Sequence, residues 1–175
     1  SVVTLQDTRL PAAMLIGDIR GATNQLLLLS FEVLGREKQA NAQSKFVQTL
    51  TRKEALSAAL DKSMADYEKL PKSEEEGAAW AKFKESMGPW KESNTALTTV
   101  LKSLSENDDA EKQPLLFTQY KAPLTAWGYV QARVDLNLTS LLTLNKTEIE
   151  AARERDTQTV QLAMRIMVIT LGVAV

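Results

Sequence analysis

The sequence contains neither cysteine nor histidine, and these two absences exclude most catalytic and metal-binding chemistry. Without cysteine there is no disulfide framework, no thiolate zinc site and no cysteine nucleophile. Without histidine the chain lacks the commonest general base, the commonest metal ligand and the usual side chain for sensing pH near neutrality. Glycine-rich phosphate loops and serine-nucleophile motifs are missing as well. We therefore expect no enzyme activity, no cofactor and no metal ion.

An excess of charge of one sign is also absent. The 21 basic and 22 acidic residues nearly cancel, which gives a formal net charge of -1 over 175 residues. A domain that binds DNA or RNA usually carries a basic surface. We therefore expect no nucleic-acid partner. The length suits one domain, and a chain of this size buries roughly 70% of the surface of its unfolded state, so a sizeable core is possible.

Apolar residues recur at helical spacing along nearly the whole chain, and no segment shows the alternation that is typical of a strand. The spacing predicts a first helix over residues 5–38, followed by a polar turn at residues 35–44. A second helix is predicted from about Phe46 to Leu70, because Pro71 disfavours helical backbone in the residue before it. These features give the first half of the chain two long helices.

Ser73 and Glu76 mark the clearest helix boundary in the sequence. Their spacing is that of a capping box, in which the serine hydroxyl caps the helix and the glutamate carboxylate reaches back to its first turn. The third helix that follows carries an apolar heptad stripe interrupted by Asn94. A second turn is predicted at residues 105–110, and a fourth helix from about residues 109–114 to the C-terminus. Four long helices joined by short turns predict an all-α, antiparallel up-down-up-down four-helix bundle.

The last residues of the chain form an apolar run. Residues 166–175 contain only one polar side chain, Thr170, and Arg165 stands just before them. The run is shorter than the roughly 20 residues that a bilayer-spanning helix needs. We interpret it as the start of a transmembrane helix, with a buried terminal helix as the alternative. The predicted organisation is an extracytoplasmic bundle over residues 1–165 and the beginning of a membrane helix over residues 166–175.

Two adjacent layers of the predicted bundle collect polar and aromatic side chains from three helices. Counting from the distal turns places six residues there: Arg20, Asn24, Trp90, Asn94, Tyr120 and Trp127. Pockets inside bundles are mostly apolar with a few convergent polar groups, and a guanidinium is suited to holding one carboxylate. In the alternative interpretation the aromatic residues are plain core, Asn94 only sets the register, and Arg20 faces solvent or a partner subunit.

The chain resembles the periplasmic four-helix-bundle sensor domains of bacterial methyl-accepting chemotaxis receptors. The resemblance rests on DTRLPAAMLIGDIRGATNQLLL (Asp7–Leu28), on YKAPLTAWGYVQARVDLNLTSLLTLN (Tyr120–Asn145) and on the run into the apolar terminus. It implies a parallel homodimer formed through the first helix, a small-metabolite ligand, and a signal carried across the membrane by a small axial shift of the fourth helix. Aspartate-sensing members use arginines late in the first helix, where Leu26–Leu34 is apolar here. This departure favours an organic acid held inside the bundle.

The resemblance and the polar layers together predict a chemoreceptor ligand-binding domain. We expect it in the periplasm, attached to the bacterial inner membrane, where it senses a cyclic or aromatic carboxylate or a Krebs-cycle acid. Arg20 would pair with the carboxylate, and Trp90 and Trp127 would wall the pocket. The hydrogen-bonding residues would be Asn24, Asn94, Thr118 and Tyr120. Two alternatives are the sensor domain of a histidine kinase and a bundle that senses indirectly through a partner protein.

Overall fold

The protein consists of four helices in the part that the structure covers. The computed structural model describes residues 8–39 and 41–172, with side chains as far as Ala163. Within these residues the elements are α2 (Leu10–Leu34), α3 (Gln43–Lys69), α4 (Glu74–Glu106) and α5 (Gln113–Gly172), and there is no strand. The all-α prediction is confirmed.

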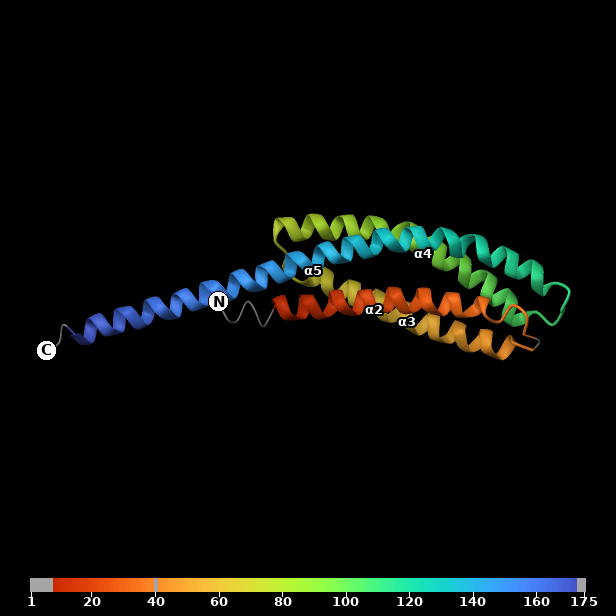
Figure 1. Ribbon diagram of the computed structural model, residues 1–175, viewed down its shortest axis with the longest axis horizontal. Coiled ribbons are helices and arrows are strands. Elements are labelled where there is room, and N and C mark those ends of the chain that lie inside the picture. Colours follow the sequence, from red (N-terminus) through yellow and green to blue (C-terminus); the bar gives the residue numbers. More distant parts are fainter. Residues whose placement is uncertain (1–7, 40, 173–175) are drawn as a thin grey trace.

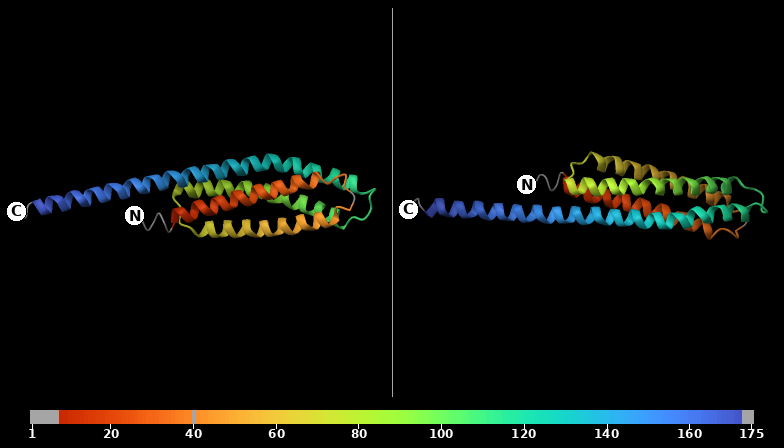
Figure 2. Two further views of the ribbon diagram at one scale, coloured as in Figure 1. Left: turned by 60° about the horizontal axis from the view of Figure 1, so that its bottom comes forward. Right: turned by 90° about the horizontal axis from the view of Figure 1, so that it is seen from above.

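The helices run alternately up and down and form one bundle (Figures 1 and 2). α2 packs against α3 and α5, and α4 packs against the same two helices from the other side. The α4–α5 pair is in the closest contact, whereas α3 and α4 touch much less. The contact between α2 and α5 is about as small as that between α3 and α4. The predicted up-down-up-down topology is confirmed.

α5 is longer than the bundle and continues alone past its end (Figure 1). The start of α2 lies at this same end, as the predicted topology requires. Side chains of residues 150–163 are almost all exposed, which agrees with their charged composition. α5 therefore connects the interior of the bundle to a segment beyond it.

Helix ends follow local sequence signals. α3 ends at Lys69, and Leu70 takes an extended backbone (ψ 142°) before Pro71, as predicted. α2 ends at Leu34, short of the predicted Lys38, and the chain then turns. Asn41 in that turn has a φ of 57°, a left-handed conformation that asparagine tolerates better than most residues. α4 runs through Pro89 and changes direction along its length (Figure 1).

Only half of the predicted capping box forms at the start of α4. The Ser73 hydroxyl accepts a hydrogen bond from the Glu76 backbone N–H at 3.2 Å, as expected. The Glu76 carboxylate does not reach back to the helix N-terminus. It is buried, where it pairs with Arg9 Nη1 at 2.5 Å and accepts a hydrogen bond from the Tyr67 hydroxyl at 2.5 Å. A cation and a phenol inside the bundle bind this carboxylate in place of the backbone.

None of the helices, over the residues described, is long and apolar enough to cross a membrane. The predicted membrane segment, residues 166–175, lies outside the residues whose side chains are described. The division of the chain at residue 165 remains a prediction.

Candidate ligand-binding site

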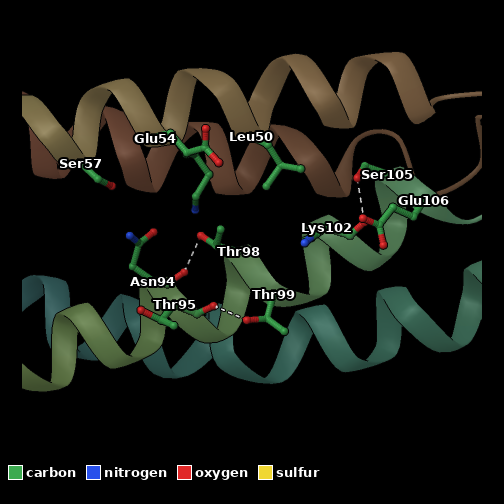
Figure 3. A pocket seen from close by; sticks show the side chains of 11 residues that line it. Leu50, Glu54, Ser57, Asn94, Thr95, Thr98, Thr99, Lys102, Ser105 and Glu106 are labelled. Atoms are coloured by element: carbon green, nitrogen blue, oxygen red, sulfur yellow. Dashed lines mark hydrogen bonds between the residues drawn. The ribbon is translucent and has the colours of Figure 1, made fainter.

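A pocket of about 600 Å³ opens between α3 and α4. Figure 3 shows side chains of Leu50 and Ser57 on α3 directed toward Asn94 and Thr98 on α4. Nearly all of the residues that line it are of polar types, although much of the surface they present is the apolar part of their side chains. The hydroxyl groups belong to Ser57, Thr95, Thr98, Thr99 and Ser105, and the charged groups to Lys53, Glu54, Lys102 and Glu106. The pocket can therefore bind a polar molecule of metabolite size.

Lys53 is the unusual member of this lining because its side chain is buried in the bundle. The residue is 1% exposed. Its Nζ donates a hydrogen bond to Ser30 Oγ at 2.6 Å and lies 5.0 Å from the centre of the Trp127 ring. No carboxylate of the described residues lies within ion-pair distance of it. Burial lowers the pKa of Lys53 from 10.5 to about 7, since a cation loses its hydration here without gaining a counter-ion.

Hydrogen bonds from α2 and α5 fix the surroundings of Lys53. Ser30 Oγ donates to the Leu26 carbonyl oxygen at 2.9 Å, which leaves a lone pair for Lys53. The Tyr120 hydroxyl donates to the Ser30 carbonyl oxygen at 3.0 Å, and burial raises the pKa of this tyrosine. The amine is thus held at the wall of the pocket by residues from neighbouring helices.

Two buried polar atoms near this site have no hydrogen-bond partner. They are Asn94 Oδ1 and Trp127 Nε1. Asn94 lines the main pocket and also a smaller one of about 200 Å³, which shares Ser57 and Thr95 with it and includes Trp90. Buried polar atoms are nearly always satisfied. An acceptor without a donor and a buried amine without a counter-ion therefore belong to residues that line one pocket.

The two tryptophans form a packed layer behind the pocket. Trp90 and Trp127 meet edge to face with their ring centroids 5.1 Å apart. Trp90 Nε1 donates to Gln131 Oε1 at 2.6 Å, and the Gln131 amide donates to Asn24 Oδ1 at 3.2 Å and to Asp135 Oδ1 at 3.1 Å. Three of the residues that the sequence placed together are therefore close in space. Gln131, which the sequence analysis missed, links two of them.

A family model described as a four helix bundle sensory module for signal transduction matches residues 1–158. The chain belongs to this family of sensory modules. The match confirms the resemblance to the sensor domains of methyl-accepting chemotaxis receptors. No curated protein and no solved structure matches the chain. A sensory module is a non-catalytic kind of fold, and the described part of the chain holds no group of three acidic residues arranged to bind a metal ion.

Two residues that the sequence assigned to the ligand site lie on the outside of the sensory module. Arg20 is exposed, because α2 turns the neighbouring Ile19 into the core and Arg20 follows one position around the helix. Thr118 is exposed beside the buried Phe117, and its hydroxyl bonds to the Pro114 carbonyl oxygen of its own helix. Neither residue lines the pockets between α3 and α4, so the structure does not bring them together with Asn94, and their roles as ligand contacts stay predictions.

The sequence analysis also placed some residues at the wrong level along the bundle axis. Tyr120 lies beside Ser30, further toward the distal turn of α2 than Asn24, with which it was grouped. The tryptophans pack mainly against each other and the core, and the main pocket contains no aromatic side chain. Of the predicted residues, Asn94 lines the main pocket, and Trp90 and Asn94 line the smaller one.

The cation of the site comes from α3, where the sequence analysis did not look for it. A signal for Lys53 was present: Phe46, Lys53, Leu60 and Tyr67 follow one another at intervals of seven residues, and all four are buried. A lysine in the middle of a core heptad stripe is unusual unless it is paired. This pattern could have identified the site.

Proposed function

We propose that this sensory module is the ligand-binding domain of a transmembrane chemoreceptor that senses a small organic acid. The observation that supports it is the buried amine of Lys53, which lacks a counter-ion at the wall of a metabolite-sized pocket. A carboxylate bound there would supply the missing negative charge, and charge-assisted hydrogen bonds of this kind are among the strongest in proteins.

The lining favours a hydroxylated acid over an aromatic one. Serine and threonine supply five of the residues that line the main pocket, and Asn94 Oδ1 lacks a donor. A ligand hydroxyl next to the carboxylate would satisfy this acceptor while Lys53 binds the acid group. Hydroxy acids of the Krebs-cycle type meet both requirements.

The packing suggests how occupancy would become a signal. The pocket lies at the loosely packed α3–α4 seam, and α4 is in close contact with α5, which leaves the bundle at the opposite end from the distal turns. A ligand that draws α3 and α4 together would move α4 against α5. We propose that α5 carries this displacement to a membrane helix beginning near residue 166, with the bundle in the periplasm and the receptor in the inner membrane.

The outer face of α2 supports a homodimer. Met14, Leu28 and Phe31 are exposed on it, and there is open space over Gly17 and Gly21, so a second α2 could approach closely. Exposed apolar side chains in one stripe often mark a protein interface. A chain that sediments as a monomer at high concentration, with and without acid, would contradict this part of the proposal.

A thermal-shift comparison of matched acids tests the ligand assignment. Malate differs from succinate by one hydroxyl group, and lactate differs from propionate in the same way. We expect the hydroxy acid of each pair to stabilise the protein more, by roughly 5–10 °C at 100 times its dissociation constant. Lys53→Met should abolish the shift, because it removes the cation while keeping the length of the side chain.

Lys102→Met is the matched control. Lys102 lines the same pocket but is exposed, so its loss should leave most of the shift in place. A shift that survives in Lys53→Met would rule out this site. If hydroxy acids, other carboxylates and amino acids all left the melting temperature of the wild-type protein unchanged, indirect sensing through a partner protein would be favoured.

A further inference from the structure

Lys53 is an amine that the fold has removed from water without giving it a charged partner. We propose that when a carboxylate binds in the α3–α4 pocket, Lys53 Nζ takes up a proton from solvent. The module would then bind its acid more weakly as the pH rises. This inference rests on the proposed function, because it concerns the same pocket and the same acid ligand.

None of the described groups that contact Lys53 carries a charge that would stabilise its ammonium form. α2 contributes the hydroxyl of Ser30, and α5 contributes the ring of Trp127 and, beyond Ser30, the hydroxyl of Tyr120. All of these are neutral, since burial raises the pKa of Tyr120. On the α4 side Asn94 lines the pocket with an amide.

The charged groups of the pocket lie at its solvent-facing side. They are Glu54 on α3 and Lys102 and Glu106 on α4, and all three side chains are exposed. Water screens charges in such positions. Burial is accordingly the cause that lowers the pKa of Lys53 to about 7, with no nearby carboxylate to oppose it.

A bound carboxylate raises the pKa of Lys53 again. An anion within hydrogen-bonding distance favours the ammonium form, so above pH 7 the neutral amine of the empty site takes one proton from solvent as the acid binds. The acid itself is already ionised at these pH values and supplies no proton. Linkage then requires the dissociation constant to rise roughly tenfold per pH unit above pH 7, until the pKa of Lys53 in the complex is reached.

Titration calorimetry of the 175-residue chain with L-malate and with D-gluconate measures this proton directly. At pH 8 the binding heat is compared between HEPES and Tris, whose ionisation enthalpies differ, and at pH 6 between two buffers that differ similarly. We expect uptake of about one proton at pH 8 and close to none at pH 6, with about tenfold weaker binding at pH 9 than at pH 8.

Two variants show whether the proton is taken up by Lys53 or by another group that titrates between pH 7 and pH 9. Lys53→Arg keeps a permanent charge, so it should bind the acid with a dissociation constant that is nearly constant between pH 7 and pH 9. Lys62→Met, which removes an exposed lysine outside the pocket, should behave like wild type, with the proton uptake intact. Should the arginine variant fail to fold, the stable neutral variant Lys53→Met gives the second comparison, with at least about a hundredfold loss of affinity expected.

The outcomes distinguish this inference from the proposed function. Equal heats in HEPES and Tris at pH 8, together with a constant dissociation constant, would overturn the proton uptake and leave an organic-acid sensor in place. Proton uptake that persists in Lys62→Met and disappears in Lys53→Arg supports the inference. No binding of either acid to wild-type protein at any pH would overturn the sensor proposal and this inference with it.

Discussion

At the scale of single residues, the site depends on an amine that destabilises the fold when it is charged. The pKa of Lys53 is about 7 in the folded protein and near 10.5 when the chain unfolds. Between these values the unfolded state binds one more proton than the folded state, so stability rises with pH by about 1.4 kcal/mol per unit. Below pH 7 both states are protonated and the folded state carries the full desolvation cost.

Lys53→Met should therefore stabilise the unliganded protein, with a gain that depends on pH. The gain should be on the order of 5 kcal/mol at pH 6 and should shrink as the pH rises from 7 to 9. Urea unfolding of wild type and variant at pH 6, 7, 8 and 9 measures the difference directly. A difference in unfolding free energy that stays constant over this range would mean that Lys53 keeps its charge in the folded protein.

At the scale of helices, a buried ion pair joins the start of α2 to the start of α4, at the end of the bundle where α5 leaves it. Arg9, just before α2, binds Glu76 of α4 at 2.5 Å and Glu148 of α5 at 2.6 Å. Glu76 also accepts the hydrogen bond from Tyr67 of α3, so this one cluster touches all four helices.

Arg9→Met should destabilise the protein because it leaves the buried carboxylate of Glu76 without its cation. The loss should be about 3 kcal/mol in the free energy of unfolding, measured by urea denaturation at pH 7. Adding Glu76→Gln to this variant should recover part of the loss, since the unpaired charge is then gone. The control is Lys62→Met, which removes the exposed pair between Lys62 and Asp66 and should change little. Equal losses in the two single variants would contradict a special role for Arg9.

Local signals in the sequence predicted the helices well and the site only in part. Pro71 and Ser73 define helix ends through backbone rules that act within a few residues, and both predictions are confirmed. The side chain of Glu76 was misplaced because its partner Arg9 is distant in the sequence and invisible to a capping rule. Arg20 was placed inside the bundle by counting residues from the distal turns, and such a count does not show which way a side chain faces. The structure buries Ile19 and leaves Arg20 exposed.

At the scale of the whole molecule, the position of the pocket fits the proposed route from the ligand to α5. Packing is tighter between α4 and α5 than between α3 and α4, where the pocket lies, and the contact between α2 and α5 is as small as that between α3 and α4. The register between helices, which decides that Lys53 and Asn94 share this seam, depends on packing across the bundle. Counting residues from the turns was too coarse to predict it.

The most direct test of the central claim is the crystal structure of the protein with bound L-malate. The account predicts the acid between α3 and α4, with one carboxylate oxygen within about 3 Å of Lys53 Nζ and a hydroxyl group donating to Asn94 Oδ1. Malate bound at the exposed face of α2 or near Arg20, with the amine of Lys53 still unpaired, would contradict it.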